Sequence, residues 1–451
     1  MTMRSDGLNI IKMSIEKIDR IERSEYKVVI IGAGLSGLMA GLNLQKKGIK
    51  TIILEKRNTP GGLCGTKVID GYEFSIACND FGAGFKKELE KLGISYIFLK
   101  ANTVFCFDHA KYHIPAKVST LFKLLPHTAD VIRFIKGLKN TKYKHLEELL
   151  NDRIKSLEFK DTLSMLAYAL AIPPHDVRIQ SVKEGFSKEF NYGYEKPVIP
   201  EGGPKKFIDE LVRKYKEMGG VVNYEEEFIN VETVKFENDK GFKKIVSSKD
   251  TYYSKFLISS QARWNKYPVD LKETVPISIV YLVLKKSFKF PENITTIACL
   301  PKNVSFWMTE IDEGRLPEEF GFHITKPDII HPSNYYTVNI NFLSPRNFEW
   351  NSKAIQKAMN YLLVKIEILL PGIYQSILYK KFISPNEFTQ LHSLSSQNFK
   401  YVLQEGFNKP DIYDPDNDIY YIGNSVSPPG EHVGGAILSA LNASNQLINQ
   451  L

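Results

Sequence analysis

The spacing of hydrophobic residues near the start of the chain predicts a βαβ unit. Residues 28–31 form a continuous apolar run, which is typical of a strand buried on both faces, and residues 38–47 carry apolar side chains at helical spacing. A second apolar run over 50–54 predicts another buried strand. Because a strand, helix and strand in this order form a right-handed crossover, the two strands should lie parallel in one sheet.

The region over 85–197 has a different pattern, with apolar residues mostly at helical spacing. Helices are predicted over 121–136, 145–157 and 161–172. A pair of prolines at 173 and 174 ends the last of them. We therefore expect a helical insertion between two parts of the sheet.

From residue 198 onward the pattern of a mixed α/β fold returns. An amphipathic helix over 205–218 precedes a strand over 221–224, and a β-rich stretch follows over 228–260. The remaining predicted elements are strands over 277–284, 335–343 and 419–423 and helices over 352–370 and 436–447. Alternation of strands and helices of this kind predicts the α/β class.

Composition agrees with a folded chain and excludes several other classes. The 451 residues are 43% hydrophobic and 24% charged, which excludes a disordered or fibrous chain, and this length allows two or three domains. The formal net charge of +8 is modest for this length and gives no indication of nucleic acid binding.

Cysteine usage and hydropathy predict a cytoplasmic protein. The four cysteines show no short spacing that would indicate a zinc site or a disulfide framework. Residues 1–24 carry charges of both signs and lack the apolar core of a signal peptide, and the longest apolar runs are much shorter than a membrane span.

The strongest chemical signal is the glycine motif over 32–37, which follows the first buried strand directly. Gly32 allows a tight turn, Gly34 lets the backbone approach a pyrophosphate, and Gly37 lets the helix pack closely on the strand. The start of the helix supplies unpaired N–H groups for an anion. Glu55 ends the second strand, where a carboxylate can accept hydrogen bonds from ribose hydroxyls. This combination predicts a dinucleotide site.

A second motif indicates which dinucleotide is bound. Residues 61–66, Gly-Gly-Leu-Cys-Gly-Thr, stand six residues after Glu55 and precede Gly71-Tyr72-Glu73-Phe74. This arrangement resembles the superfamily of FAD-dependent amine oxidases, phytoene desaturases and protoporphyrinogen oxidases. Leu63, where arginine is frequent, is similar to the desaturase and protoporphyrinogen oxidase branch. The resemblance implies FAD as the cofactor.

Two later blocks extend the resemblance. Residues 198–224 are similar to the segment that re-enters the FAD domain of the family, and Phe228 stands where the family commonly has a valine whose backbone meets the adenine. Residues 419–437 resemble the closing strand, loop and helix, with Asn424 at the usual acidic position; an asparagine can still accept a hydrogen bond. The helix start near Gly434 would lie under the flavin pyrimidine and stabilise negative charge on it.

The resemblance and the motifs together give one set of predicted cofactor residues. They are Gly32, Gly34, Leu35, Ser36, Gly37, Glu55, Lys56, Gly61, Gly62, Leu63, Phe228, Gly423, Asn424, Val433 and Gly434. The implied fold is a Rossmann-like FAD domain of the glutathione reductase type with a parallel sheet and a second α+β substrate domain. We assign residues 25–84, 198–262 and 411–451 to the first domain and residues 85–197 and 263–410 to the second.

The implied activity is that of an FAD-dependent oxidoreductase, an oxidase or desaturase. It would remove a hydride from a C–H or C–N bond of a partly apolar small molecule and pass electrons to oxygen or another redox partner. Amine or amino-acid oxidation is an alternative, although residues 277–284 lack the lysine that those oxidases carry. A second alternative is isomerisation without net redox change. The third is a non-catalytic binding protein on the same scaffold, against which the intact glycine motifs argue.

His432 is the predicted catalytic residue. It stands where the related oxidases place an aromatic ring facing the flavin, and a histidine can act as acid or base near neutral pH. The alternative is a loop histidine that only bonds to the backbone.

Other candidates are weaker. We interpret Cys64 and Cys78 as small buried residues, and His109 and His113 lie on an expected strand and turn, so no metal site is predicted. The basic stretch over 117–144 is interpreted as a solvated face over a packed core, and peripheral membrane contact is the less favoured alternative.

Overall fold

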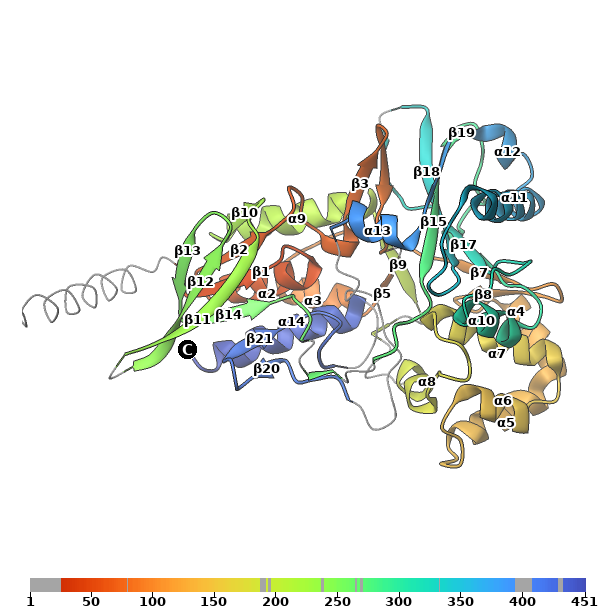
Figure 1. Cartoon of the computed structure of the whole chain (residues 1–451), viewed down its shortest axis with the longest axis horizontal. Coiled ribbons are helices and arrows are strands. Elements are labelled where there is room, and N and C mark those ends of the chain that lie inside the picture. The colour runs from red at the N-terminus through yellow and green to blue at the C-terminus, as the bar shows by residue number, and fades with distance from the viewer. Residues whose placement is uncertain are drawn as a thin grey trace, which may run out of the picture.

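A six-stranded sheet forms one end of the molecule in the computed structural model, which describes residues 26–78, 80–186, 192–193, 196–236, 239–263, 266–267, 271–331, 333–393, 408–428 and 433–451 (Figure 1). The strands, in spatial order, are β10 (Val221–Tyr224), β2 (Thr51–Glu55), β1 (Val28–Ile31), β14 (Phe256–Ser259), β21 (Ile419–Tyr421) and β20 (Tyr413–Asp414). All neighbours pair in parallel except β20 with β21. The predicted parallel sheet and the α/β class are confirmed.

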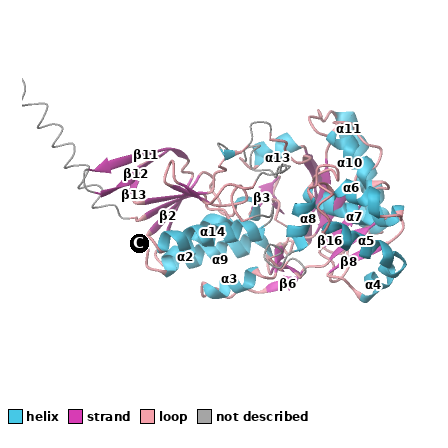
Figure 2. Ribbon diagram, turned by 90° about the horizontal axis from the view of Figure 1, so that it is seen from below, coloured by secondary structure: helices cyan, strands magenta, loops and turns pink. Residues whose placement is uncertain are grey.

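Helices cover one face of this sheet and a β-meander covers the other (Figure 2). The helices are α2 (Leu35–Lys46), α9 (Gly203–Glu217) and α14 (Val433–Ile448), and the meander consists of β11 (Phe228–Phe236), β12 (Asp239–Ser247) and β13 (Thr251–Ser254). Every residue of β1 and β2 is buried, as the continuous apolar runs predicted, because both faces are covered.

A seven-stranded sheet organises the other end of the molecule. Its strands, in order, are β19 (Ile377–Ile383), β15 (Ile277–Lys285), β18 (Tyr335–Leu343), β17 (Phe322–Thr325), β16 (Thr296–Cys299), β7 (Thr103–Cys106) and β8 (Lys111–Ile114). One face packs on α11 (Ser352–Leu369) and α12 (Ile373–Ser376). The opposite face meets α13 (Pro385–Leu391) and the hairpin of β3 (Thr66–Ile69) and β4 (Tyr72–Ser75).

Helices of the insertion pack beside this sheet and form their own core. They are α4 (Val118–Leu124), α5 (Thr128–Leu138), α6 (Leu146–Arg153), α7 (Leu157–Leu170), α8 (Ile179–Phe186) and, from later in the chain, α10 (Val304–Asp312). The single helix predicted over 121–136 is wrong: it is divided by the short 3-10 helix η2 (Leu125–His127), which contains Pro126.

Short elements join the two ends. They include a three-stranded sheet of β5 (Phe81–Gly82), β9 (Pro197–Pro200) and β6 (Phe98–Lys100). The helix α3 (Phe85–Lys91) connects β5 to β6, and the 3-10 helix η1 (Gly62–Cys64) begins within the second glycine motif. No helix in the described ranges combines the length and apolarity needed to cross a bilayer. The division into two domains stays a prediction.

Candidate nucleotide-binding site

The predicted cofactor residues gather at one edge of the parallel sheet. Because β1, β2, β14 and β21 run parallel, the residues that follow them share the same edge, and ligands of such sheets bind there. Gly32 follows β1, Glu55 ends β2, Ser260 follows β14, and Gly423 comes soon after β21. Four segments that are far apart in sequence thus contribute to one site.

The turn after β1 requires glycine at two positions. Gly32 has a φ of +97°, and a Cβ there would lie 2.2 Å from the Ser260 hydroxyl oxygen. A Cβ on Gly37 would lie 1.9 Å from the Gly32 carbonyl oxygen. Neither position tolerates a side chain, because the neighbouring atoms belong to the turn itself or to the adjacent strand.

The two glycine motifs contact each other through their backbones. The Gly61 N–H donates to the Ala33 carbonyl at 2.8 Å, and Gly34 forms a parallel bridge with Gly61. A Cβ on Gly62 would lie 3.2 Å from the Gly34 α-carbon. Because Gly34, Gly61 and Gly62 have no side chains, only backbone atoms of the two motifs lie beside the start of α2 at these positions.

The start of α2 has the features of an anion site. Gly34 is the N-cap and has no side-chain cap, and no acidic residue occupies the first turn. The first bond within the helix runs from the Leu38 N–H to the Gly34 carbonyl, so the N–H groups of Leu35 and Ser36 precede it. A helix start with unpaired donors and no competing carboxylate favours a pyrophosphate.

Glu55 is buried next to this turn. Its side chain is 4% exposed, with Oε2 accepting from the Ala33 N–H at 2.7 Å and Oε1 accepting from the Arg57 N–H at 2.9 Å. Each carboxylate oxygen keeps a further lone pair that can accept a hydrogen bond from a hydroxyl. The Glu226 N–H bonds to the Glu55 carbonyl, which brings the start of β11 and Phe228 close to the end of β2.

The basic residue beside Glu55 is Arg57, which sequence reasoning missed. Its Nε lies 3.6 Å from Glu55 Oε1, and its Nη2 lies 3.7 Å from the Cβ position of Gly62. Lys56, which was predicted, is exposed. The signal that could have found Arg57 is the alternation of side chains at a strand end, since residues two apart point the same way.

The closing loop presents an unsatisfied acceptor at the same edge. The amide oxygen of Asn424, Oδ1, is buried and has no hydrogen-bond partner among the described residues, while the Asn424 carbonyl accepts from the buried Lys409 ammonium at 2.6 Å. Gly423 has a φ of +104°, and its N–H donates to Ser439 of α14 at 2.8 Å. A buried amide oxygen without a donor is costly, so this atom is suited to a hydroxyl of a bound group.

The second helix start lies at the same edge. Asn43 near the end of α2 donates to Ser444 and Asn445 near the end of α14, so the two helices run parallel and both begin at the site. Val433 and Gly434 form the first turn of α14. His432, the predicted catalytic residue, lies outside the described residues.

A partly buried polar cluster on the seven-stranded sheet was missed entirely. The Tyr168 hydroxyl of α7 lies 2.9 Å from His323 Nδ1, and the Asn341 amide nitrogen lies 3.1 Å from His323 Nε2. Burial raises the pKa of Tyr168 well above its usual value, which keeps the phenol neutral. We name these three residues the Tyr168–His323–Asn341 cluster.

This cluster shares its sheet face with the residues that meet the β3–β4 hairpin. On β18, Asn339 and Asn341 are two residues apart and therefore point to the same face. Asn339 donates to the Ser75 carbonyl of β4 at 2.8 Å, and its own Oδ1 is buried without a partner. The face that carries the cluster thus adjoins the segment that follows the second glycine motif.

A histidine under the same hairpin is held neutral by its surroundings. His392, at the end of α13, is 1% exposed, and its Nε2 lies 3.5 Å from the Tyr281 hydroxyl. Burial, together with the positive charges of Arg57 and Lys67, lowers the pKa of His392 to about 4.

The weaker candidates form no site. A hydrogen bond with the Cys64 side chain, together with burial, raises the pKa of Cys78 well above its usual value, which makes the Cys78 thiol a poor nucleophile. His109 contacts Thr162, and His113 lies on the neighbouring strand β8.

One cluster in the described part of the chain has ligand types suited to a metal: His175, Asp176 and Asp312. Lys272 binds both of its carboxylates, at 2.6 and 2.7 Å, and therefore already supplies the cation.

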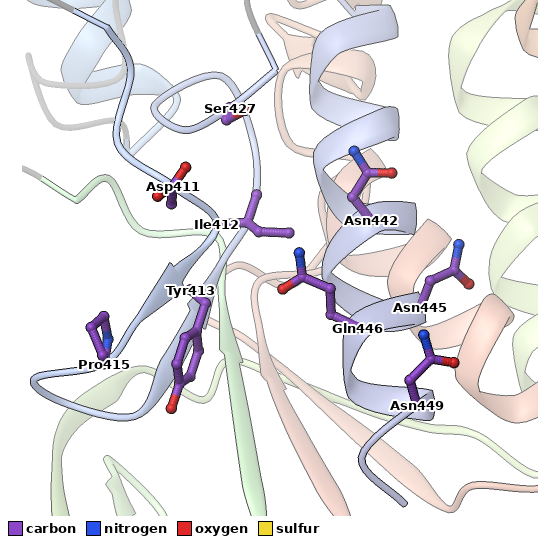
Figure 3. A pocket seen from close by; sticks show the side chains of 9 residues that line it. All are labelled: Asp411, Ile412, Tyr413, Pro415, Ser427, Asn442, Asn445, Gln446 and Asn449. Atoms are coloured by element: carbon purple, nitrogen blue, oxygen red, sulfur yellow. The ribbon is translucent and has the colours of Figure 1, made fainter.

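A polar groove of about 550 Å³ lies elsewhere on the surface (Figure 3). Exposed amide side chains of the second half of α14 line one side, and residues 411–415 line the other. No residue of the glycine motifs lines this groove, so it is separate from the nucleotide edge.

Comparison with known proteins agrees with this geometry. Residues 30–89 match the model of the NAD(P)-binding Rossmann-like domain family. An oxidoreductase from Methanosarcina mazei superposes with a TM-score of 0.62 at 16% identity, covering 93% of this chain and 99% of that one. Cyclohexylamine oxidase from Brevibacterium oxydans superposes with a TM-score of 0.60 at 13% identity, covering 94% and 99%. The chain therefore has a mixed α/β fold of the amine oxidase type.

Relatives found by sequence similarity are named isomerases rather than oxidases. Prolycopene isomerase 2 from an Oncidium hybrid is 22% identical over 95% of this chain and 85% of its own length. The resemblance predicted from the glycine motifs is confirmed, and the amine oxidase fold carries a Rossmann-like nucleotide-binding domain at the edge described above.

Proposed function

We propose that this protein is an FAD-dependent oxidoreductase that acts on a partly apolar small organic molecule. The observation that carries the proposal is the convergence of two helix starts, two side-chain-free glycine turns and the buried acceptors of Glu55 and Asn424 at one sheet edge. A dinucleotide presents an anionic pyrophosphate and several hydroxyls, and this edge offers partners for both.

Different residues would bind different parts of the cofactor. The N–H groups of Leu35 and Ser36 would bind the pyrophosphate, Glu55 would accept from ribose hydroxyls, and Asn424 Oδ1 would accept from the ribityl chain. The start of α14 would stabilise negative charge on the pyrimidine side of the flavin. Bound FAD supplies a two-electron acceptor for a hydride, and oxygen or another redox partner would receive the electrons.

The seven-stranded sheet would form the substrate side. The polar groups of the Tyr168–His323–Asn341 cluster lie beside apolar residues of β15 and the hairpin, which suits a mainly apolar molecule with one polar or reactive point. The neutral phenol of Tyr168 can donate a hydrogen bond or a proton, and His323 can hold the complementary proton.

A second candidate is isomerisation without net redox change. Two observations favour it: relatives at 22% identity are named prolycopene isomerases, and the cluster provides a partly buried acid–base pair from this chain's own residues. Amine oxidation has less support, because the lysine of β15 stands at its last position, Lys285, and bonds to the Gln375 carbonyl at the surface.

An anaerobic screen separates these functions. Candidate substrates are added without oxygen while the flavin absorbance is followed. An oxidoreductase bleaches with its substrate and recovers when air is admitted. An isomerase converts its substrate with the flavin spectrum the same before and after turnover. A protein that binds no FAD would contradict both enzymatic functions. It would favour the remaining alternative, a non-catalytic binding protein.

A further inference from the structure

The outer surface of α4 and α5 carries exposed apolar side chains, and no residue in the described ranges covers them. Leu121, Phe122 and Leu125 are 58%, 65% and 61% exposed, and Ile132 and Ile135 continue the surface along α5. We call these five residues, with Val118 at the start of α4, the α4–α5 face. The sequence predicted a basic solvated face over a packed core; the structure instead turns these apolar side chains outward.

The opposite side of these helices is firmly attached, so the exposure is a property of the folded state. Phe134 is buried, and a Cβ on Gly137 would lie 2.9 Å from the Leu149 side chain of α6. The buried Asp130 accepts hydrogen bonds from the backbone N–H groups of Lys155 and Ser156. These contacts fix α5, and on α4 the buried Thr120 hydroxyl accepts a hydrogen bond from the His113 N–H of β8, so both helices are held with the α4–α5 face outward.

A basic segment surrounds this face. Residues 111–144 contain seven lysines and one arginine but a single acidic residue, Asp130. Asp130 is buried and bonded to Arg133, and Asp152, outside the segment, pairs with Lys142 at its far end. Lys117, Lys123, Lys136 and Lys139 are all exposed beside the apolar residues. This short segment holds most of the excess positive charge of the chain.

Apolar side chains with a rim of lysines match the surface of an anionic bilayer. The apolar residues can enter the boundary between headgroups and acyl chains while the ammonium groups meet lipid phosphates and carboxylates. A protein partner fits less well, because protein interfaces are depleted in lysine. We propose that the α4–α5 face docks the protein on an anionic lipid bilayer without crossing it.

The position of the face agrees with this role. Both views place α4 and α5 at the end of the molecule remote from the parallel sheet and the C-terminus, where docking leaves the nucleotide edge clear (Figures 1 and 2). The proposal does not depend on the cofactor or on the reaction, and its test uses neither.

Sedimentation with lipid vesicles tests the proposal on the whole protein. The wild type is expected to sediment with vesicles of phosphatidylcholine and phosphatidylserine, more weakly with phosphatidylcholine alone, and less as salt rises. The combined variant Leu121→Ser, Phe122→Ser and Leu125→Ser should lose affinity by about tenfold or more. Since all three positions are exposed, the variant should keep the wild-type melting temperature.

A matched control comes from α11. Val364 and Ile368 are 61% and 70% exposed on another helix, outside the basic segment, and Val364→Ser with Ile368→Ser should leave vesicle binding unchanged. Three results would overturn the proposal. The first is no binding to anionic vesicles, and the second is equal loss in both variants. The third is a wild-type dimer without lipid affinity that the triple variant dissociates, which would assign the face to contacts between copies.

Discussion

The nucleotide edge and the substrate side of this molecule are built in different ways. At the edge, the site consists mainly of backbone: bare glycine turns, helix starts and strand ends, with Glu55 and Asn424 as fixed acceptors. On the seven-stranded sheet, the site consists of side chains such as Tyr168 and His323, which are 155 residues apart. A site made of backbone is encoded in short motifs, whereas a site made of side chains depends on the complete fold.

The largest effect is expected when one methyl group is added to the nucleotide edge. Gly37→Ala places a Cβ at 1.9 Å from the Gly32 carbonyl oxygen, so the turn and the helix must separate. We expect the free energy of unfolding to fall by about 3 kcal/mol, together with loss of nucleotide binding. Urea unfolding measures the first effect.

The matched control for this substitution is Gly185→Ala. A Cβ at Gly185 in α8 meets no atom within 4 Å, and alanine there should be neutral or slightly stabilising. Equal stability of the Gly37→Ala and Gly185→Ala proteins would show that the edge is not a backbone site.

A substitution on the substrate side should lower the activity without releasing the cofactor. Tyr168→Phe removes the hydroxyl group that contacts His323 and leaves the ring in its apolar surroundings. With a substrate from the anaerobic screen, we expect kcat to fall by about a hundredfold while FAD affinity stays constant. Unchanged kcat and KM would reduce the cluster to a structural role.

The buried His392 makes the stability of the folded protein depend on pH. Its pKa of about 4 in the folded protein lies below the ordinary value of 6.5, so the unfolded chain takes up the proton more readily. The stabilising contribution is complete above about pH 6.5 and is lost as the pH falls toward about 4.

Replacing His392 tests this dependence of stability on pH. Between about pH 7 and about pH 5, the wild type should lose about 2 kcal/mol of stability that His392→Phe retains, because phenylalanine takes up no proton. Denaturant unfolding at the two pH values measures the difference. Parallel pH profiles for the two proteins would mean that His392 is protonated without cost in the fold.

The smallest effect is expected at the basic residue beside Glu55. Arg57→Gln removes the guanidinium beside Glu55 and Gly62 and should weaken FAD binding by about tenfold. The neighbouring Lys56→Gln, at an exposed position, should leave affinity unchanged. Fluorescence titration of the apoprotein compares them, and a larger effect at Lys56 would reverse the assignment.

The sequence predicts the edge well because local physics determines it. The apolar runs gave β1 and β2 within one residue, and glycines at the required positions of the turn gave the site between them. The start of α2 was placed three residues late, since the apolar periodicity begins at Leu38 whereas the cap is Gly34. The division of the helix predicted over 121–136 was missed although Pro126 signals it.

The substrate side resists prediction for a physical reason. Nothing local distinguishes Tyr168 in an amphipathic helix, or His323 and Asn341 in apolar strands, until the sheet register places His323 opposite Asn341 and the helix packs across them. Asn424 was found only through its family position, and its unsatisfied oxygen is visible only in three dimensions.

The central claim is that the edge binds FAD, and the visible absorption spectrum of the purified protein tests it most directly. We expect twin flavin bands, release of FAD by acid, and a colourless Gly34→Val variant, because valine would fill the gap between Gly34 and Gly62. A colourless wild type that also fails to bind added FAD, or a Gly34→Val variant that keeps its full flavin content, would contradict it.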